Sequence, residues 1–153
     1  MSKTLVITSG YFNPVHLGHV SCFEEARELG DKLVVIVNND IQQVFKKGKI
    51  IMDEQERLAI IQAFRAVDEA VLASDDYQLK NGEIPCIHSV EKVILNHQST
   101  HDNFIFAKGG DRAAPEQIPE YDVCQKYNVK TIFNVGNPKT NSSTKINQLT
   151  GKE

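Results

Sequence analysis

The sequence predicts an α/β domain in which a parallel sheet carries helices on both faces. Five short apolar runs recur along the 153 residues, at 5–8, 33–37, 70–72, 104–107 and 131–135. The segments between them are long enough to hold helices, and this alternation is the pattern of a parallel sheet. The length predicts one domain, residues 1–153, that buries roughly two-thirds of the surface of its unfolded chain.

The segments between the strands carry helix signals of their own. Residues 19–30 have apolar side chains at helical spacing and end on Gly30, a residue typical of C-caps. Residues 53–64 open with Asp53 and Glu56, which are spaced as a capping box. Three further helix candidates follow, at 84–97, at 115–127 with Pro119 limiting where the helix starts, and at 142–150 as a final turn or two.

Composition limits the partners and the compartment. Hydrophobic residues make up 41% of the chain, charged residues 24%, and the net charge is −3, which is typical of a globular protein and not of a basic nucleic-acid binder. No window approaches the ~20 apolar residues of a membrane span. Three cysteines, Cys22, Cys86 and Cys124, suit neither a disulfide framework nor a zinc quartet. We therefore expect a cytoplasmic protein without nucleic-acid or membrane partners.

Two histidines follow the first strand, in the stretch GYFNPVHLGH. An open parallel sheet binds its ligand at the carboxyl ends of the strands, where the chain order reverses, here beside the first strand. If a helix begins at residue 15 or 16, His16 and His19 share one face of its first turn, next to backbone N–H groups and the positive end of the helix dipole. That place attracts phosphate, and Gly10 and Gly18 would let a polyphosphate approach the backbone.

Two other interpretations of the pair remain: packed or solvated histidines without a ligand, and metal ligands. A metal site needs further ligands, but neither the cysteines nor His88, His97 and His101 have ligand spacing with the pair. The chain has no G-x-x-x-x-G-K-[ST], and no G-x-G-x-x-G follows the first strand. This argues against a P-loop enzyme and against an ordinary dinucleotide dehydrogenase.

Four further segments could extend an anion site. Lys46, Lys47 and Lys49 follow the second strand, either as a mobile lysine-rich lid or as a solvated loop. Arg57 stands in the first turn of a helix, with phosphate or Asp53 as its candidate partner. Two more groups have residue types that bind anions. The first follows the fourth strand and comprises Lys108, Gly109, Gly110, Asp111 and Arg112. The second lies near the end of the sequence and comprises Ser142, Ser143, Thr144 and Lys145.

These residues resemble the HxGH nucleotidyltransferases of the cytidylyltransferase-like superfamily. HLGH is similar to the signature histidines, and NSSTKI is similar to the late serine- and threonine-rich phosphate motif, so the resemblance covers nearly the whole chain. It implies a Rossmann-like, doubly wound sheet, often in a homodimer. It also implies transfer of a nucleoside monophosphate from ATP or CTP to a phosphorylated small acceptor, with release of pyrophosphate and with Mg²⁺ held mainly by the NTP phosphates.

The resemblance also assigns roles to the matching positions. The implied catalytic residues are His16 and His19 as triphosphate ligands, Lys46 as the loop lysine and Arg57 as a helix arginine near phosphate. The implied nucleotide-binding residues are Gly10, Tyr11, Phe12, Asn13, Gly18, Lys108, Gly109, Gly110, Asp111, Arg112, Ser142, Ser143, Thr144 and Lys145. An acceptor phosphate is already anionic, so its attack on the α-phosphorus requires positioning and charge stabilisation more than a strong base.

Other similarities bear on the substrates. The motifs KGGD and DEQER are similar to those of adenylyltransferases that build ADP-heptose. The motif STKI is similar to the corresponding motif of glycerol-3-phosphate cytidylyltransferase. In that enzyme the preceding residues follow the pattern R-T-x-G-I-S, whereas this chain has NPKTNSS. Asn13 stands where many members carry Asp. We expect a sugar- or polyol-phosphate acceptor, with ATP preferred over CTP.

Three alternatives remain. The first is an adenylyltransferase of cofactor biosynthesis acting on nicotinamide mononucleotide or phosphopantetheine, since GYFNPVH is similar to that group. The second is a relative of class I aminoacyl-tRNA synthetases, although the chain is short and slightly acidic for a tRNA reader. The third is a regulatory module that binds a nucleotide without turning it over.

Overall fold

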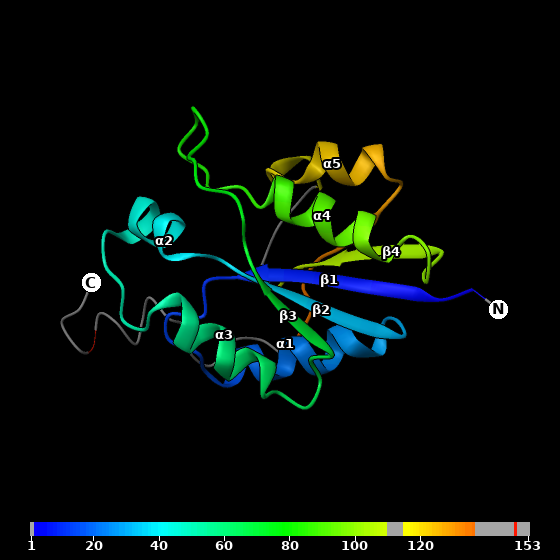
Figure 1. The fold of residues 1–153 in the computed structure, drawn as a ribbon, viewed down its shortest axis with the longest axis horizontal. Helices are drawn as coiled ribbons and strands as arrows, with labels where there is room; N and C mark the ends of the chain where they lie inside the picture. The colour runs from blue at the N-terminus through cyan, green and yellow to red at the C-terminus, as the bar shows by residue number, and fades with distance from the viewer. Residues whose placement is uncertain (1, 110–114, 137–148, 150–153) are drawn as a thin grey trace.

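A computed structural model describes residues 2–109, 115–136 and 149 of the chain (Figure 1). Five strands form one sheet in the order β3-β2-β1-β4-β5, and every neighbouring pair is parallel. The strands are β1 (Thr4–Gly10), β2 (Lys32–Val37), β3 (Glu69–Leu72), β4 (Asn103–Ala107) and β5 (Lys130–Ile132). The predicted parallel sheet is confirmed, and its chain order reverses beside β1.

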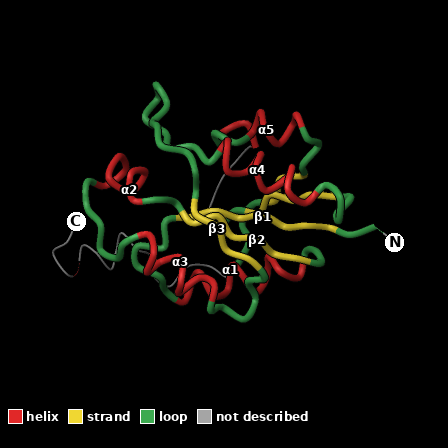
Figure 2. The backbone as a smooth tube through the Cα atoms, viewed as in Figure 1, coloured by secondary structure: helices red, strands yellow, loops and turns green. Residues whose placement is uncertain are grey.

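Helices cover both faces of this sheet, also as predicted (Figure 2). The helices are α1 (Leu17–Glu28), α2 (Asp40–Lys47), α3 (Glu54–Gln62), α4 (Ile87–His97) and α5 (Tyr121–Lys126), with a short 3-10 turn at Pro115–Gln117. Leu5 packs in the core with α4 and α5, whereas its neighbour Val6 packs with α1 and α3. Side chains alternate across a strand, so β1 supplies both cores.

Helix α2 is absent from the sequence-based prediction, which placed a loop there. Its ends carry regular signals, because the Asn39 side chain accepts a hydrogen bond from Gln42 N at 2.9 Å and Gly48 ends the helix in the left-handed region at φ 71°. We interpreted the lysines of this segment as a solvated loop or lid, and the prediction was wrong on that point. Lys46 and Lys47 lie in the last turn of α2.

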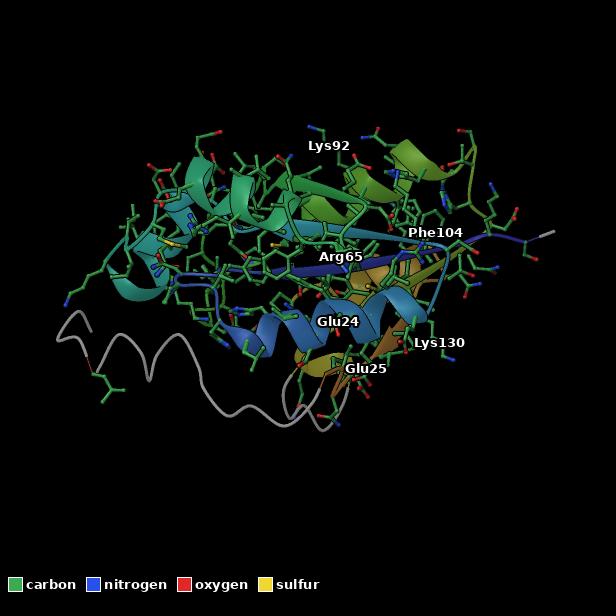
Figure 3. The ribbon with its side chains drawn as sticks, turned by 90° about the horizontal axis from the view of Figure 1, so that it is seen from below. Glu24, Glu25, Arg65, Lys92, Phe104 and Lys130 are labelled. Atoms are coloured by element: carbon green, nitrogen blue, oxygen red, sulfur yellow. The ribbon has the colours of Figure 1, made fainter. Side chains whose placement is uncertain are left out.

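Three helix or strand ends also differ from the prediction. Helix α1 ends on Leu29 as its C-cap, and Gly30 instead allows a close approach, because a Cβ there would lie 2.8 Å from the Thr4 carbonyl oxygen. Strand β5 stops at Ile132, before residue 135. The segment after it is tied to α1, since Gly136 N donates to Glu25 Oε2 at 2.7 Å; Figure 3 shows Glu25 on α1. The fourth predicted helix splits into the 3-10 turn and α5.

Candidate functional site

The candidate site lies at the carboxyl end of β1, where the crossover through α1 leads to β2 on one side and the crossover through α4, on the other face, leads to β4 on the other side. Gly10 ends β1, and Lys108 directly follows β4, the strand across the chain-order reversal. The Lys108 ammonium donates to the Ser9 carbonyl oxygen at 3.2 Å and contacts Ser9 Oγ at 2.9 Å. A cationic side chain thus bridges the two strand ends at the place where open α/β sheets bind ligands.

His16 is the N-cap of α1, so the helix begins at Leu17, slightly later than expected. The Gly18 N–H donates to His16 Nδ1 at 3.1 Å, and the His16 N–H donates to His19 Nδ1, also at 3.1 Å. The two imidazoles thereby form a reciprocal capping box of the kind usually built by Ser or Thr with Glu. The Gly18 N–H, which we expected to meet phosphate, is directed at an imidazole nitrogen.

The same bonds fix the tautomer of both rings. Because Nδ1 of His16 and of His19 accepts a backbone N–H, a neutral ring carries its proton on Nε2. The ring centroids are 3.9 Å apart, and His19 also meets the Phe12 ring edge to face at 4.9 Å. The histidines are therefore held as a pair with donor groups at Nε2, at the positive end of the helix dipole.

Gly10 and Phe12 belong to the packing beneath this pair. Phe12 is 4% exposed and lies in the core with α1. Its backbone adopts the left-handed region, with φ at 55°. A Cβ at Gly10 would lie 2.8 Å from the tip of the Phe12 ring. The missing side chain of Gly10 thus makes room for Phe12, whose ring is buried, and the expected nucleotide contacts of both residues stay predictions.

Asn13 is also turned toward the protein, with 3% of its surface exposed. Its Oδ1 accepts hydrogen bonds from Ile51 N at 3.0 Å and from Met52 N at 2.8 Å. These two bonds fasten the loop between α2 and α3 to the turn after β1. Asn13 thus positions a loop through its side-chain oxygen, an acceptor that Asp would also supply.

Arg57 lies in the first turn of α3, as predicted, but its side chain is directed into the protein. Its side chain has no exposed surface, and it donates to the carbonyl oxygens of Met52, Tyr11 and Asn38 at 2.9, 2.8 and 2.6 Å. Its ionic partner is Asp40, at 2.7 Å, and not Asp53. Arg57 thus holds together the three loops that surround the site, and its expected contact with phosphate stays a prediction.

Lys46 comes close to the turn after β1 from the last turn of α2. Its ammonium lies 4.3 Å from the centroid of the Tyr11 ring, a cation–π contact that brings a positive charge beside the candidate phosphate site. Lys49 follows the helix and is exposed. A lysine beside the turn after β1 is thus present, but a helix carries it.

Several predicted residues lie outside the part of the chain that the structure describes. They are Gly110, Asp111, Arg112, Ser142, Ser143, Thr144 and Lys145. Gly109 is described, and a Cβ there would lie 3.3 Å from the Val135 carbonyl oxygen, so this glycine lets β4 approach the segment after β5.

Sequence reasoning missed a buried polar layer next to Tyr11. The Asn38 amide donates to Gln42 Oε1 at 3.1 Å and contacts Cys86 Sγ at 3.4 Å, while the Cys86 N–H donates to Glu120 Oε1 at 2.8 Å. Burial, with Glu120 nearby, raises the pKa of the Cys86 thiol to about 12. The signal available in the sequence was the polar run Asn38 to Gln43 directly after an apolar strand.

Tyr11, in the turn after β1, faces this layer. Its hydroxyl is buried and has no hydrogen-bond partner among the described residues. Burial, followed by the charges of Cys86 and Glu120, raises the pKa of this hydroxyl above its ordinary value. A neutral hydroxyl and a buried carboxylate therefore lie close enough to interact electrostatically.

A search of the described residues found neither a metal-binding cluster nor a membrane-spanning helix. Among them, no group of three or more His, Cys, Asp or Glu side chains is placed to hold a metal ion. Likewise, none of the helices in the described ranges is long and apolar enough to cross a bilayer.

Comparison with known proteins agrees with the fold. Residues 7–148 match the model of the family described as cytidylyltransferase-like. An FAD synthase of Ferroglobus placidus is 44% identical over 71 residues, which cover 46% of this chain and 46% of that protein. The bifunctional protein HldE of Geobacter metallireducens is 30% identical over 156 residues, covering 99% of this chain and 28% of that protein. The chain thus matches less than half the length of either relative.

Two solved structures have the same architecture. The lipopolysaccharide core biosynthesis protein of Thermoplasma volcanium is 29% identical with a TM-score of 0.60, covering 90% of this chain and 100% of that one. The bifunctional NMN adenylyltransferase/ADP ribose pyrophosphatase of Francisella tularensis shares the fold, with a TM-score of 0.63. It is 16% identical, and the match covers 97% of this chain and 42% of that one. With the family model matched from β1 nearly to the end of the chain, the protein belongs to the cytidylyltransferase-like family.

Proposed function

We propose that this protein is an adenylyltransferase that moves AMP from ATP to a phosphorylated small molecule and releases pyrophosphate. The observation that carries the proposal is the histidine pair, whose Nδ1 atoms cap α1 and whose Nε2 atoms bear the donor protons. ATP is preferred over CTP because the similar proteins include FAD synthases, and FAD contains an AMP unit.

The reaction needs one bond to form and one to break. A phosphate oxygen of the acceptor attacks the α-phosphorus of ATP, a new P–O–P link forms, and the bond between the α-phosphorus and the bridging oxygen breaks as pyrophosphate leaves. Negative charge accumulates on the leaving pyrophosphate. Donors held in place before the reaction stabilise that charge without reorganising, which is the main contribution we assign to His16 and His19.

The two lysines complete the electrostatic set. Lys46, beside the Tyr11 ring, and Lys108, beside Ser9, bring cationic groups toward the end of β1 from two elements. Both would neutralise phosphate charge as point charges on flexible stems. Arg57 and Asn13 contribute indirectly, because they hold the loops that carry these groups.

Mg²⁺ fits this site as a companion of the nucleotide. The described donors near the histidine pair are imidazole and ammonium nitrogens, which suit phosphate and not a hard cation, so the triphosphate and water would ligate the ion. When bound, Mg²⁺ supplies additional neutralisation of the phosphate charge.

For the acceptor we propose a sugar or polyol phosphate. The polar layer supports this choice, since the Tyr11 hydroxyl and the Glu120 carboxylate could hydrogen-bond to hydroxyl groups of such an acceptor. Similarity to HldE and to the lipopolysaccharide core biosynthesis protein supports it too. A second candidate is FMN, which the 44% identity with an FAD synthase favours.

The buried thiols of Cys86 and Cys124 are free, which fits the proposed location in a reducing cytoplasm.

The test is a crossed screen of ATP, CTP, GTP and UTP against sugar 1-phosphates, glycerol 3-phosphate, FMN, nicotinamide mononucleotide and phosphopantetheine, with pyrophosphate release as the readout. We expect release with ATP and one class of acceptor. Tight nucleotide binding without release for every acceptor would instead identify the regulatory module. Release with CTP alone would overturn the choice of ATP.

A further inference from the structure

Strands β1 and β4 separate at their carboxyl ends. The ladder between them ends at the pair Ile7 and Phe106. Continuing its register by two residues would bring Ser9 opposite Lys108, but the Lys108 N–H donates to the Ile132 carbonyl oxygen of β5 at 2.9 Å. The main chain after β4 has therefore turned toward β5 at the point where the ladder to β1 would continue.

The Lys108 side chain takes the place of the missing ladder bond. Its ammonium donates to the Ser9 carbonyl oxygen at 3.2 Å and to Ser9 Oγ at 2.9 Å. A free lysine side chain samples many rotamers, and two bonds to one residue restrict the position of its charged end. Because an ammonium has three N–H groups, these bonds leave one of them for a ligand.

The positive charge of Lys108 has no carboxylate partner in the described part of the chain, where no ion pair includes it. Its neighbours are the hydroxyl and carbonyl oxygen of Ser9 and the Phe106 ring, whose centroid lies 5.6 Å from the ammonium. Dipoles and a ring face stabilise a cation but leave its charge in place. A bound anion would supply the compensating charge.

Ser9 and Lys108 share the face of the sheet that α4 and α5 cover. Phe106, two residues before Lys108, packs in the core under these helices, and side chains two residues apart on a strand point to the same side. Ile7 packs in the same core, and Ser9 follows it by two residues. The ammonium therefore reaches the gap between the strands from the α4 side.

The histidine pair adjoins the other core, because His19 contacts the Phe12 ring, which packs under α1. Lys108 instead lies close to the polar layer. Burial, followed by the Glu120 charge, raises the pKa of the Cys86 thiol, and the positive charge of Lys108 opposes this increase. The histidines and Lys108 thus approach the end of β1 from different faces of the sheet.

We propose that Ser9 is a positioning residue that holds the Lys108 ammonium in the gap between β1 and β4, where it binds the phosphate of the acceptor. The triphosphate of the nucleotide occupies the side of the histidine pair, and the acceptor phosphate occupies the side of Lys108. This inference rests on the proposed function, since a transfer between two phosphates is what requires two anion sites.

The first test measures steady-state kinetics with ATP and the acceptor that gives pyrophosphate release. In Ser9→Ala we expect the KM for the acceptor to rise about tenfold, as for the loss of a hydrogen bond to a charged group. The KM for ATP and the melting temperature should stay unchanged. Ser9→Thr, which restores the hydroxyl, should return the KM for the acceptor to within a few-fold of the wild type.

The matched control is Ser99→Ala, at an exposed serine after α4, which should change neither KM. A Ser9→Ala variant with the wild-type KM for the acceptor, or with a raised KM for ATP alone, overturns the proposal. A lowered melting temperature that Ser9→Thr does not restore, with the same change in both KM values, assigns Ser9 to the fold and also overturns it.

The second test needs no turnover and uses inorganic phosphate as the probe. Isotope-labelled lysine side chains are followed by NMR, and the Lys108 signal is identified by its absence in Lys108→Arg. We expect phosphate to shift this signal, with a midpoint about tenfold higher in Ser9→Ala and restored in Ser9→Thr. A Lys108 signal that phosphate does not move, or an equal midpoint in Ser9→Ala, overturns the proposal whether or not an acceptor is turned over. A shift of the expected kind without turnover of any acceptor supports the anion site and counts against the proposed function.

Discussion

Arg57 Nη2 lies 2.7 Å from Asp40 Oδ1, and this ion pair joins the start of α2 to the first turn of α3 beneath the candidate site. The guanidinium has no exposed surface and also binds three carbonyl oxygens, including that of Tyr11. Because these protein groups bind the guanidinium, Arg57 has a structural role in the site.

Replacing this arginine should therefore unfold the protein more easily. We expect Arg57→Ala to lower the free energy of unfolding by about 3 kcal/mol, because Asp40 and three carbonyl oxygens lose their partner. Urea unfolding followed by circular dichroism measures this. Arg65→Ala, at an exposed arginine labelled in Figure 3, is the matched control and should change the value by less than about 0.5 kcal/mol. If the stability is unchanged and turnover is lost, the result would support the expected contact between Arg57 and phosphate instead.

Asn13 offers a test of loop positioning. In Asn13→Ala the N–H groups of Ile51 and Met52 lose their acceptor, and we expect a loss of about 1–3 kcal/mol in the free energy of unfolding. Asn13→Asp keeps an acceptor and should lose less stability than the alanine variant, with turnover within a few-fold of the wild type. A collapse of turnover in Asn13→Asp at full stability would show a direct role in the reaction.

The histidine pair permits a separation of capping from catalysis. His16→Asn and His19→Asn each retain an acceptor close to the position of Nδ1 but lack the Nε2 donor. We expect the melting temperature to change little, because Asn is a good N-cap residue at position 16 and keeps an acceptor for the residue-16 N–H at position 19. We expect kcat to fall on the order of a hundredfold, as for the loss of a transition-state donor. Full activity in both variants would make the pair purely structural.

Burial of the Cys86 thiol predicts a pH dependence of stability. Its pKa is about 12 in the folded chain and about 8.5 when unfolded. Above pH ~8.5 the unfolded chain loses a proton that the folded chain keeps, so this contribution to stability is full below that pH and is lost as the pH rises toward 12.

Unfolding measured between pH 8 and pH 11 tests this. Cys86→Ala should reduce the downward slope of stability against pH by up to about 1.4 kcal/mol per pH unit. Cys124, whose pKa burial also raises to about 12, should behave alike when replaced by alanine. An unchanged slope in both variants contradicts the assignment.

The sheet and most helices could be predicted because their signals are local. The apolar runs of the strands and the capping residue Asp53 fixed the type and order of the elements, and the chain-order reversal beside β1 followed from them. Helix α2 was missed because the prediction looked for a core-facing apolar stripe, whereas Gln42 faces the protein. The capping pair of Asn39 and Gln42 was the signal to use.

The position of the histidine pair was predictable from its place after the first strand, but its bonding was not. Sequence spacing placed His16 and His19 on one helix face, yet it could not show that each ring accepts a backbone N–H. The partners of Arg57 and Asn13 also escaped prediction. They are main-chain atoms distant in sequence, and no residue type in a motif reports on such a contact.

The contact between Gly10 and the Phe12 ring has an evolutionary consequence. Since a Cβ at position 10 would overlap the ring, a side chain can appear there only if position 12 becomes smaller. Within the family, these two positions should therefore change together. A chain that keeps a large aromatic residue at the second position should keep glycine at the first, whichever nucleotide or acceptor it uses.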